Sequence, residues 1–181
     1  MREVKLIAAM SSDGFIAREK SEISTHWTSR EDAQWFAQKT KAIGLCVMGR
    51  TTYQTIGRPL PDRSTIILTS QPSLFETTQI PPLDQITGKL PSLVTTNLEP
   101  LALLTELEAR GYEKIAICGG ASVYTQFMKA GLVTNLYLTI EPVVFGQGVR
   151  LFAEPLDIKL KLIATHKLSD QTIVQELQKV D

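Results

Sequence analysis

The chain has 181 residues, of which 43% are hydrophobic and 21% are charged, a composition that is ordinary for one globular domain spanning residues 1–181. Nineteen basic residues balance nineteen acidic ones. No net charge therefore attracts the chain to nucleic acid or a membrane surface, and we expect neither as a partner. The sequence has no apolar run of signal-peptide or transmembrane type, so we expect a cytoplasmic protein.

The first half of the chain alternates apolar strands with polar helices. The apolar run over residues 4–10 predicts a buried strand, which ends at the turn signal Ser12-Asp13-Gly14. A polar segment follows it. Next we expect, in order, a helix, a strand, a short helix and a β-branched strand, at residues 29–42, 45–48, 51–56 and 65–69.

The second half begins with residues 71–91, which are rich in Pro, Thr and Gln and are expected to form a surface excursion. Strands and helices then alternate again, at residues 92–96, 99–110, 114–118, 122–130 and 135–140. Residues 159–179 alternate in hydrophobicity around Ser169-Asp170-Gln171 and indicate a hairpin.

This order predicts an α/β fold of three layers, with a mainly parallel central sheet, an antiparallel C-terminal edge hairpin and helices on both faces. Ligands of such sheets bind beyond the carboxyl ends of the strands. Four strand ends are therefore expected to line one cleft: Ala9-Met10, Met48-Gly49-Arg50, Leu68-Thr69-Ser70 and Cys118-Gly119-Gly120.

Two of these strand ends have the chemistry of an anion site. Gly119-Gly120 lets a ligand approach the backbone, and the helix after it offers free N–H groups to a phosphate. Arg50 opposes the dipole of its own helix unless an anion binds there. Two such turns in one sheet fit a pyrophosphate, although a tight strand-to-helix turn explains the glycines about as well. Thr69 and Ser70 add hydroxyls that a simple polar turn would also explain.

Arginines flank the rigid segment Pro59-Leu60-Pro61. The planar fork of Arg58 or Arg63 suits a carboxylate or phosphate on a ligand, because it can bind two oxygens at once. Surface solubility is the alternative explanation of the same residues.

Two acids stand at the start of the first helix. Thr28 and Glu31 fit a capping box, which gives Glu31 a structural explanation. Asp32 lies three and four residues before Trp35 and Phe36, so helix geometry places it on their side. If that side faces a pocket, burial raises the pKa of Asp32, and the carboxylate needs hydrogen-bond donors such as those of a heterocycle. The alternative is a solvated acid that the helix dipole favours.

Both cysteines, Cys46 and Cys118, lie in apolar runs, which is typical of core thiols in a reducing compartment. No CxxC spacing or His/Cys cluster predicts a metal site, and none is expected. The two histidines, His26 and His166, are expected at the surface or in loops and not as ligands.

Taken in order, these motifs resemble the dihydrofolate reductase superfamily. The most specific stretch is VMGRTTYQTIGRPLPDRSTIILTSQ at residues 47–71, supported by LIAAM at 6–10 and GGASVYTQF at 119–127. Trp27, Asp32, Trp35 and Phe36 are in register with the W…D…WF pattern of that family. The resemblance implies reduction of 7,8-dihydrofolate, a small-molecule substrate, by NADPH.

The resemblance also implies roles for individual residues. Asp32 would hold the amino-pyrimidine edge of the pterin and promote its protonation, with Thr139 behind it and Trp27 beside the mobile loop. The substrate would contact Phe36, Ile56 and Leu60, and Arg63 would bind its glutamate carboxylate. The cofactor would contact Ala9, Ile16, Gly49, Arg50, Thr51, Thr52, Thr69, Ser70, Gly119, Gly120, Ala121, Ser122, Val123 and Tyr124.

Some residues depart from the pattern of the family. His26 replaces a usual proline, Ala121 replaces the third glycine, and Ser122 replaces a basic residue, which weakens the preference for NADPH over NADH. MSSDGFIA at 10–17 and VVFGQGVRLF at 143–152 look more like the pyrimidine reductase domain of riboflavin biosynthesis. Reduction of a ribosylamino-pyrimidine phosphate or a related heterocycle therefore stays open, as does nucleotide binding without catalysis. The oligomeric state is not indicated.

Overall fold

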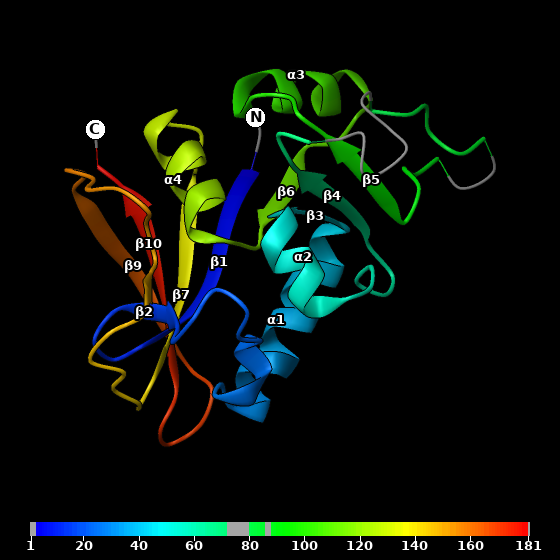
Figure 1. The fold of residues 1–181 in the computed structure, drawn as a ribbon. Helices are drawn as coiled ribbons and strands as arrows, with labels where there is room; N and C mark the ends of the chain where they lie inside the picture. The colour runs from blue at the N-terminus through cyan, green and yellow to red at the C-terminus, as the bar shows by residue number, and fades with distance from the viewer. Residues whose placement is uncertain (1–2, 72–79, 86–87, 181) are drawn as a thin grey trace.

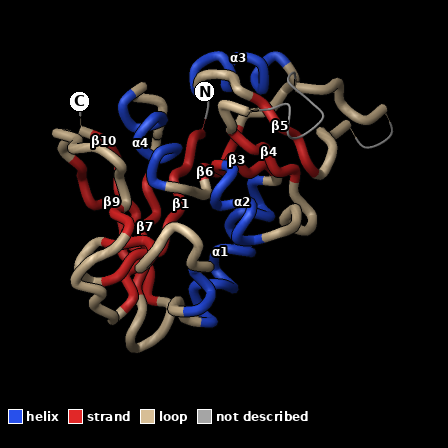
Figure 2. The backbone as a smooth tube through the Cα atoms, in the orientation of Figure 1, coloured by secondary structure: helices blue, strands red, loops and turns tan. Residues whose placement is uncertain are grey.

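The computed structural model describes residues 3–71, 80–85 and 88–180. A central eight-stranded sheet has the order β5-β4-β3-β6-β1-β7-β10-β9 (Figures 1 and 2). A small second sheet pairs β2 with β8. The strands are β1 (Glu3–Ser11), β2 (Phe15–Ala17), β3 (Leu45–Gly49), β4 (Ser64–Leu68), β5 (Leu93–Thr96), β6 (Lys114–Ile117), β7 (Asn135–Glu141), β8 (Val149–Arg150), β9 (Leu160–Lys167) and β10 (Ile173–Lys179). The helices are η1 (Ser24–His26, a 3₁₀ turn), α1 (Arg30–Ile43), α2 (Arg50–Ile56), α3 (Pro100–Ala109) and α4 (Ala121–Lys129).

The sheet confirms the expected fold class. The six strands from β5 to β7 are parallel to their neighbours, whereas β10 is antiparallel to both β7 and β9. Parallel neighbours need crossover connections, and α1 to α4 supply most of them. The C-terminal hairpin forms the antiparallel edge at the position predicted from residues 159–179.

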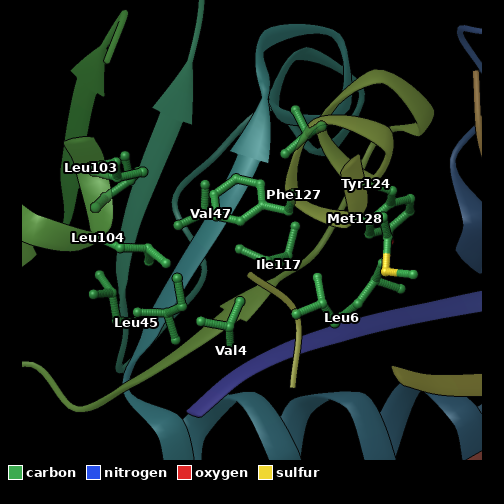
Figure 3. Packing of buried hydrophobic residues seen from close by; sticks show 14 of the residues in the cluster. Val4, Leu6, Leu45, Val47, Leu103, Leu104, Ile117, Tyr124, Phe127 and Met128 are labelled. Carbon is green, nitrogen blue, oxygen red and sulfur yellow. The ribbon is translucent and has the colours of Figure 1, made fainter. Parts of the chain in front are cut away.

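Helices cover both faces of the sheet. The larger core joins α3 and α4 to one face, through buried side chains such as Leu103 and Phe127 packed on Leu6 and Val47 (Figure 3). The smaller core places Trp35 and Phe36 of α1 against Ile7, Cys46 and Tyr137 on the other face. Successive residues of a strand point to opposite faces, so Leu6 and Ile7 serve different cores. Both cysteines are free thiols; Cys46 is buried and Cys118 is half-buried.

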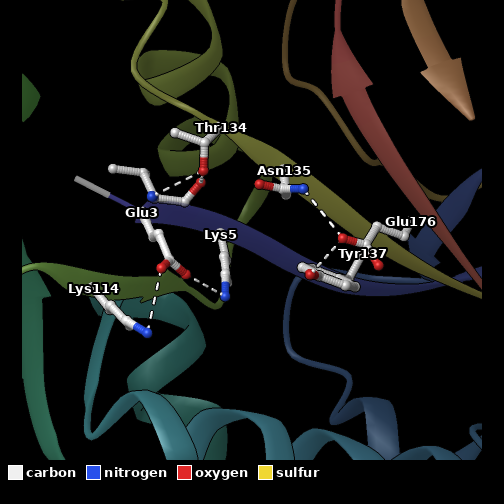
Figure 4. Close-up of polar contacts among 8 residues, drawn as sticks. Glu3, Lys5, Lys114, Thr134, Asn135, Tyr137 and Glu176 are labelled. Atoms are coloured by element: carbon white, nitrogen blue, oxygen red, sulfur yellow. Dashed lines mark hydrogen bonds and ion pairs between the residues drawn. The ribbon is translucent and has the colours of Figure 1, made fainter. Parts of the chain in front are cut away.

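Polar contacts secure the amino ends of the central strands. The Thr134 hydroxyl donates to the Val4 carbonyl over 3.0 Å, and Glu3 pairs with Lys5 and Lys114 (Figure 4). Further along β7, the Tyr137 hydroxyl donates to Glu176 on β10 over 2.8 Å. These contacts lie away from the carboxyl ends of the strands, where the predicted site residues are.

Three short elements were not predicted from the sequence, namely β2, β8 and η1. Each has only two or three residues, which is too short to produce a hydrophobic period. β2 and β8 pair with each other through long-range contacts, so neither segment specifies its strand alone.

The expected surface excursion over residues 71–91 is only partly correct, and its residues 72–79 and 86–87 lie outside the described structure. Two of its apolar residues, Ile80 and Leu90, are buried in the larger core. Leu90 is held at both backbone groups, since it donates to the Tyr112 hydroxyl and accepts from the Ser64 hydroxyl. The segment is therefore anchored to the core at two points. Among the described residues, no helix combines the length and apolarity needed to cross a membrane.

Candidate active site

The two glycine turns predicted to bind an anion lie side by side. The strands before them, β3 and β6, are hydrogen-bonded neighbours, and the Gly49 N–H donates to the Gly119 carbonyl over 2.8 Å. A Cβ on Gly119 would stand 3.1 Å from the Thr52 methyl, and one on Gly120 would stand 3.0 Å from its hydroxyl. Both added side chains would crowd Thr52, and at Gly119, where φ is +129°, an L side chain would also strain the backbone.

The helices that follow these turns begin without side-chain caps among the described residues. The N-cap positions of α2 and α4 are Gly49 and Gly120, which have no side chain to accept the first N–H groups. The unpaired N–H groups of both first turns are therefore available to an anion, and both helix dipoles favour it. Two adjacent uncapped helix starts fit the diphosphate of a dinucleotide.

The arginine of the first turn reaches toward the next strand end. Arg50 donates through Nη1 to the Gln71 side chain over 2.9 Å. Gln71 in turn donates its backbone N–H to Thr69, and Ser70 between them is exposed. A cation and two hydroxyl side chains thus surround the end of β4.

The other residues expected at the cofactor occupy several environments. Ala9 is half-buried near the carboxyl end of β1, and Ile16 packs against the larger core from β2. Thr51 and Ser122 are exposed, whereas Ala121 is half-buried. Val123 and Tyr124 are buried, and the Tyr124 hydroxyl already donates to the Ile7 carbonyl over 2.7 Å. Contact of these residues with a cofactor stays a prediction.

Asp32 is buried, with 8% of its surface exposed. Burial raises the pKa of its carboxyl, and the negative charge of Glu141 adds to that rise. Hydrogen bonds with the side chains of Thr139 and Thr28 oppose the shift, because they stabilise the carboxylate. Asp32 is thus a desolvated acid beside the carboxyl end of β7, and the sequence had placed it on the inward side of α1.

The cap of α1 differs from the prediction. Ser29, not Thr28, is the N-cap, and its hydroxyl accepts the Asp32 N–H over 3.2 Å. Glu31 is exposed in the first turn, where it favours the helix dipole but is not three residues after the cap. The predicted capping box was therefore wrong by one residue. Either residue could cap on local chemistry, and the contact of Ser29 with the distant Glu141 distinguishes them.

Trp27 lies at the turn that leads into α1. Its ring meets Phe145 edge-on at a centroid distance of 5.0 Å, and Arg18 stacks on the same Phe145 ring at 4.2 Å. The Trp27 Nε1 is buried and has no hydrogen-bond partner among the described residues. A buried N–H without a partner is costly, so this group is suited to donate to a water or ligand.

The substrate-side residues predicted from the sequence are only partly gathered by the structure. Phe36 and Leu60 pack against the same smaller core, and Ile56 ends α2 half-buried. Arg63 is buried: it donates through Nε to the Pro61 carbonyl over 2.9 Å and through Nη1 to the Thr40 hydroxyl. Two of its five N–H donors are therefore engaged, which holds the guanidinium in one orientation and leaves three donors for a ligand.

Two acidic residues of this region were missed. Glu141 is buried at the end of β7 beside the start of α1, and the sequence offers no signal for it apart from its place two residues after Thr139. Asp13 was assigned only to a turn signal. Its carboxylate accepts the N–H groups of Phe145 and Gly146, the latter over 2.7 Å, and so joins the loop after β1 to the loop after β7.

The chain is similar to known dihydrofolate reductases. The family model described as dihydrofolate reductase matches residues 3–146. The dihydrofolate reductase of Buchnera aphidicola is 28% identical over 144 residues, which cover 79% of this chain and 74% of that protein.

Solved structures of other proteins share the fold. A putative riboflavin biosynthesis protein from Shewanella aligns with a TM-score of 0.75 at 19% identity, over 99% of both chains. The dihydrofolate reductase of Enterococcus faecalis, complexed with NADP(H), aligns with a TM-score of 0.69 at 22% identity, over 99% of this chain and 97% of that one. At these identities the similarity shows the fold alone.

Proposed function

The chain belongs to the dihydrofolate reductase family, and we propose that it reduces 7,8-dihydrofolate to tetrahydrofolate with NADPH. The observation that carries the proposal is the buried Asp32, whose pKa is raised by burial and whose carboxyl interacts with Thr139. A desolvated acid of this kind suits a heterocycle that offers adjacent N–H donors and must gain a proton.

In this proposal the two glycine turns hold the cofactor. The uncapped starts of α2 and α4 bind its phosphates, and Arg50 adds a positive charge beside Thr69 and Ser70. The bound nicotinamide would supply the hydride. The complex of the Enterococcus faecalis enzyme with NADP(H) supports this assignment of the ligand.

The residues of this chain would then act on the substrate. Asp32 holds the amino-pyrimidine edge and assists proton delivery to the ring nitrogen that neighbours the reduced carbon. Trp27 offers its unpaired N–H to a water or to the pterin. Phe36 and Leu60 cover the apolar part of the substrate, and Arg63 faces its carboxylate tail. Fixing both rings in contact supplies much of the rate.

A second candidate, reduction of a ribosylamino-pyrimidine phosphate, is favoured by one observation. The two motifs that resemble the riboflavin branch form a single unit: Asp13 of the first accepts the N–H groups of Phe145 and Gly146 of the second, and β2 pairs with β8. A Cβ on Gly148 would stand 2.3 Å from the Ala17 carbonyl oxygen, so the two segments are in close backbone contact.

The test is direct. Purified protein is mixed with NADPH and dihydrofolate, and the loss of nicotinamide absorbance is followed; steady turnover is expected. No turnover at micromolar enzyme would reject the folate proposal. Turnover of the pyrimidine phosphate alone would establish the second candidate. Binding of NADPH without reduction of either substrate would indicate a nucleotide-binding protein.

A further inference from the structure

Glu141 is a buried carboxylate without a cationic partner among the described residues. It ends β7 with 3% of its surface exposed. Its Oε1 accepts both the backbone N–H and the hydroxyl of Ser29, each over 2.8 Å, and its Oε2 accepts the Thr172 hydroxyl over 3.1 Å. Three hydrogen bonds and the dipole at the start of α1 therefore offset the free-energy cost of burying this carboxylate.

These bonds join three distant parts of the chain. Thr172 belongs to the turn between β9 and β10 and is itself buried. Ser29 is the N-cap of α1, and its hydroxyl donates to Glu141 while it accepts the N–H of Asp32. A continuous hydrogen-bonded series thus runs from the C-terminal hairpin through Thr172, Glu141 and Ser29 to Asp32.

We propose that Glu141 is a positioning residue for Asp32: it fixes the first turn of α1 against β7 and the C-terminal hairpin, and it supplies a second negative charge close to the active-site carboxyl. This inference rests on the proposed function of Asp32. It concerns a residue after Thr139 that the W…D…WF pattern does not include.

The charge of Glu141 has a definite effect on its neighbour. Two nearby carboxylates resist being ionised together, so Glu141 favours the protonated form of Asp32. Among the described residues, the titratable groups that interact electrostatically with Asp32 are Glu141 from β7 and Tyr124 from α4. The pKa of Tyr124 is raised well above its usual value, chiefly by burial, so Tyr124 remains neutral and does not supply the negative charge.

To test this role, the carboxyl of Asp32 is followed by carbon NMR in protein labelled with ¹³C at the aspartate side chain, without ligand. Glu141→Gln keeps the shape and an acceptor for Ser29 but removes the charge. We expect the titration midpoint of Asp32 to move to lower pH. Thr172→Val, which removes a hydrogen bond and keeps the charge, is the matched control and should move it less. An unchanged midpoint in Glu141→Gln would overturn the role of the charge.

A second variant tests the positioning and remains informative if Glu141→Gln does not fold. Ser29→Ala keeps both carboxylates and removes the hydroxyl between them. We expect faster hydrogen exchange at the Asp32 amide and a lower kcat for the reduction of dihydrofolate, with NADPH affinity unchanged. Exchange and kcat equal to the wild type would contradict the positioning role. The NMR titration and the exchange need no turnover, so a failure of the proposed reaction is distinguishable from a failure of this inference.

Discussion

The two halves of the candidate site are built in different ways. The half formed by β3, β6, α2 and α4 relies on backbone: glycines in contact, uncapped helix starts and a 2.8 Å bond from Gly49 to Gly119. The half around Asp32 relies on side chains: Ser29, which caps the same helix, and Thr139 and Glu141 of the distant strand β7. The first is suited to hold an anion common to many reactions, and the second to set the protonation that one reaction needs.

This contrast predicts its largest effect at Asp32. Asp32→Asn removes the acid but keeps a similar shape, so we expect dihydrofolate turnover to fall about 10²- to 10⁴-fold, the usual contribution of a general acid. NADPH affinity, measured by fluorescence titration, should stay within about twofold, because the backbone half is untouched. Glu31→Gln, an exposed acid of the same helix turn, is the control and should keep full turnover. Equal turnover in Asp32→Asn and wild type would refute the role.

A substitution in the backbone half should weaken NADPH binding and leave Asp32 unaffected. Gly119→Ala places a methyl 3.1 Å from Thr52, on a residue with φ of +129°. We expect NADPH to bind about 10- to 100-fold more weakly, a loss of about 1.4–2.8 kcal/mol, with the titration of Asp32 unchanged. Gly131→Ala also has a positive φ but open space around it, so it controls for backbone strain. Calorimetric titration of both variants with NADPH distinguishes them; equal affinities would argue against a cofactor site at this turn.

A smaller effect is expected at Arg63, whose guanidinium is held by Pro61 and Thr40. Arg63→Lys loses the planar fork, so KM for dihydrofolate should rise about tenfold while kcat changes little. For a dihydropterin without the glutamate tail, the variant and wild type should have the same KM. Arg58→Lys, on the exposed part of the same loop, should leave both values unchanged. A rise in KM for both substrates would contradict a contact with the tail.

The smallest effect concerns stability. The folded-state pKa of Asp32 is raised above its ordinary value of 3.8. The contribution of protonated Asp32 to folding stability is therefore complete below pH 3.8, and it is lost as pH rises through the folded pKa and the buried carboxyl ionises. Asp32→Asn should therefore melt at nearly the wild-type temperature at about pH 3.5 and on the order of 2–4 °C higher at pH 7, equivalent to about 1 kcal/mol. Calorimetric Tm measurements across this range test the sign; a lower Tm of the variant at pH 7 would show that Asp32 stabilises the fold when ionised.

Local patterns predicted most of the fold because its helices and strands are long enough to carry a period. The parallel sheet, the edge hairpin and the inward side of α1 all follow from such patterns. Short elements such as β2 and β8 exist only because they pair with each other. Ile80 and Leu90 are buried although their surroundings are polar and rich in proline, because partners elsewhere in the chain satisfy their backbone groups.

The sequence by itself determined the two glycine turns and the candidate acid Asp32, since each depends on residues close together in the chain. Only the tertiary structure decided which residue caps α1, because the choice between Thr28 and Ser29 depends on Glu141, 112 residues away from Ser29. It also decided that Glu141 is buried beside Asp32. Hydrogen bonds and charge interactions act over a few ångströms in space whatever the separation in sequence, so the environment of the acid became visible only when β7, α1 and the C-terminal hairpin were brought together.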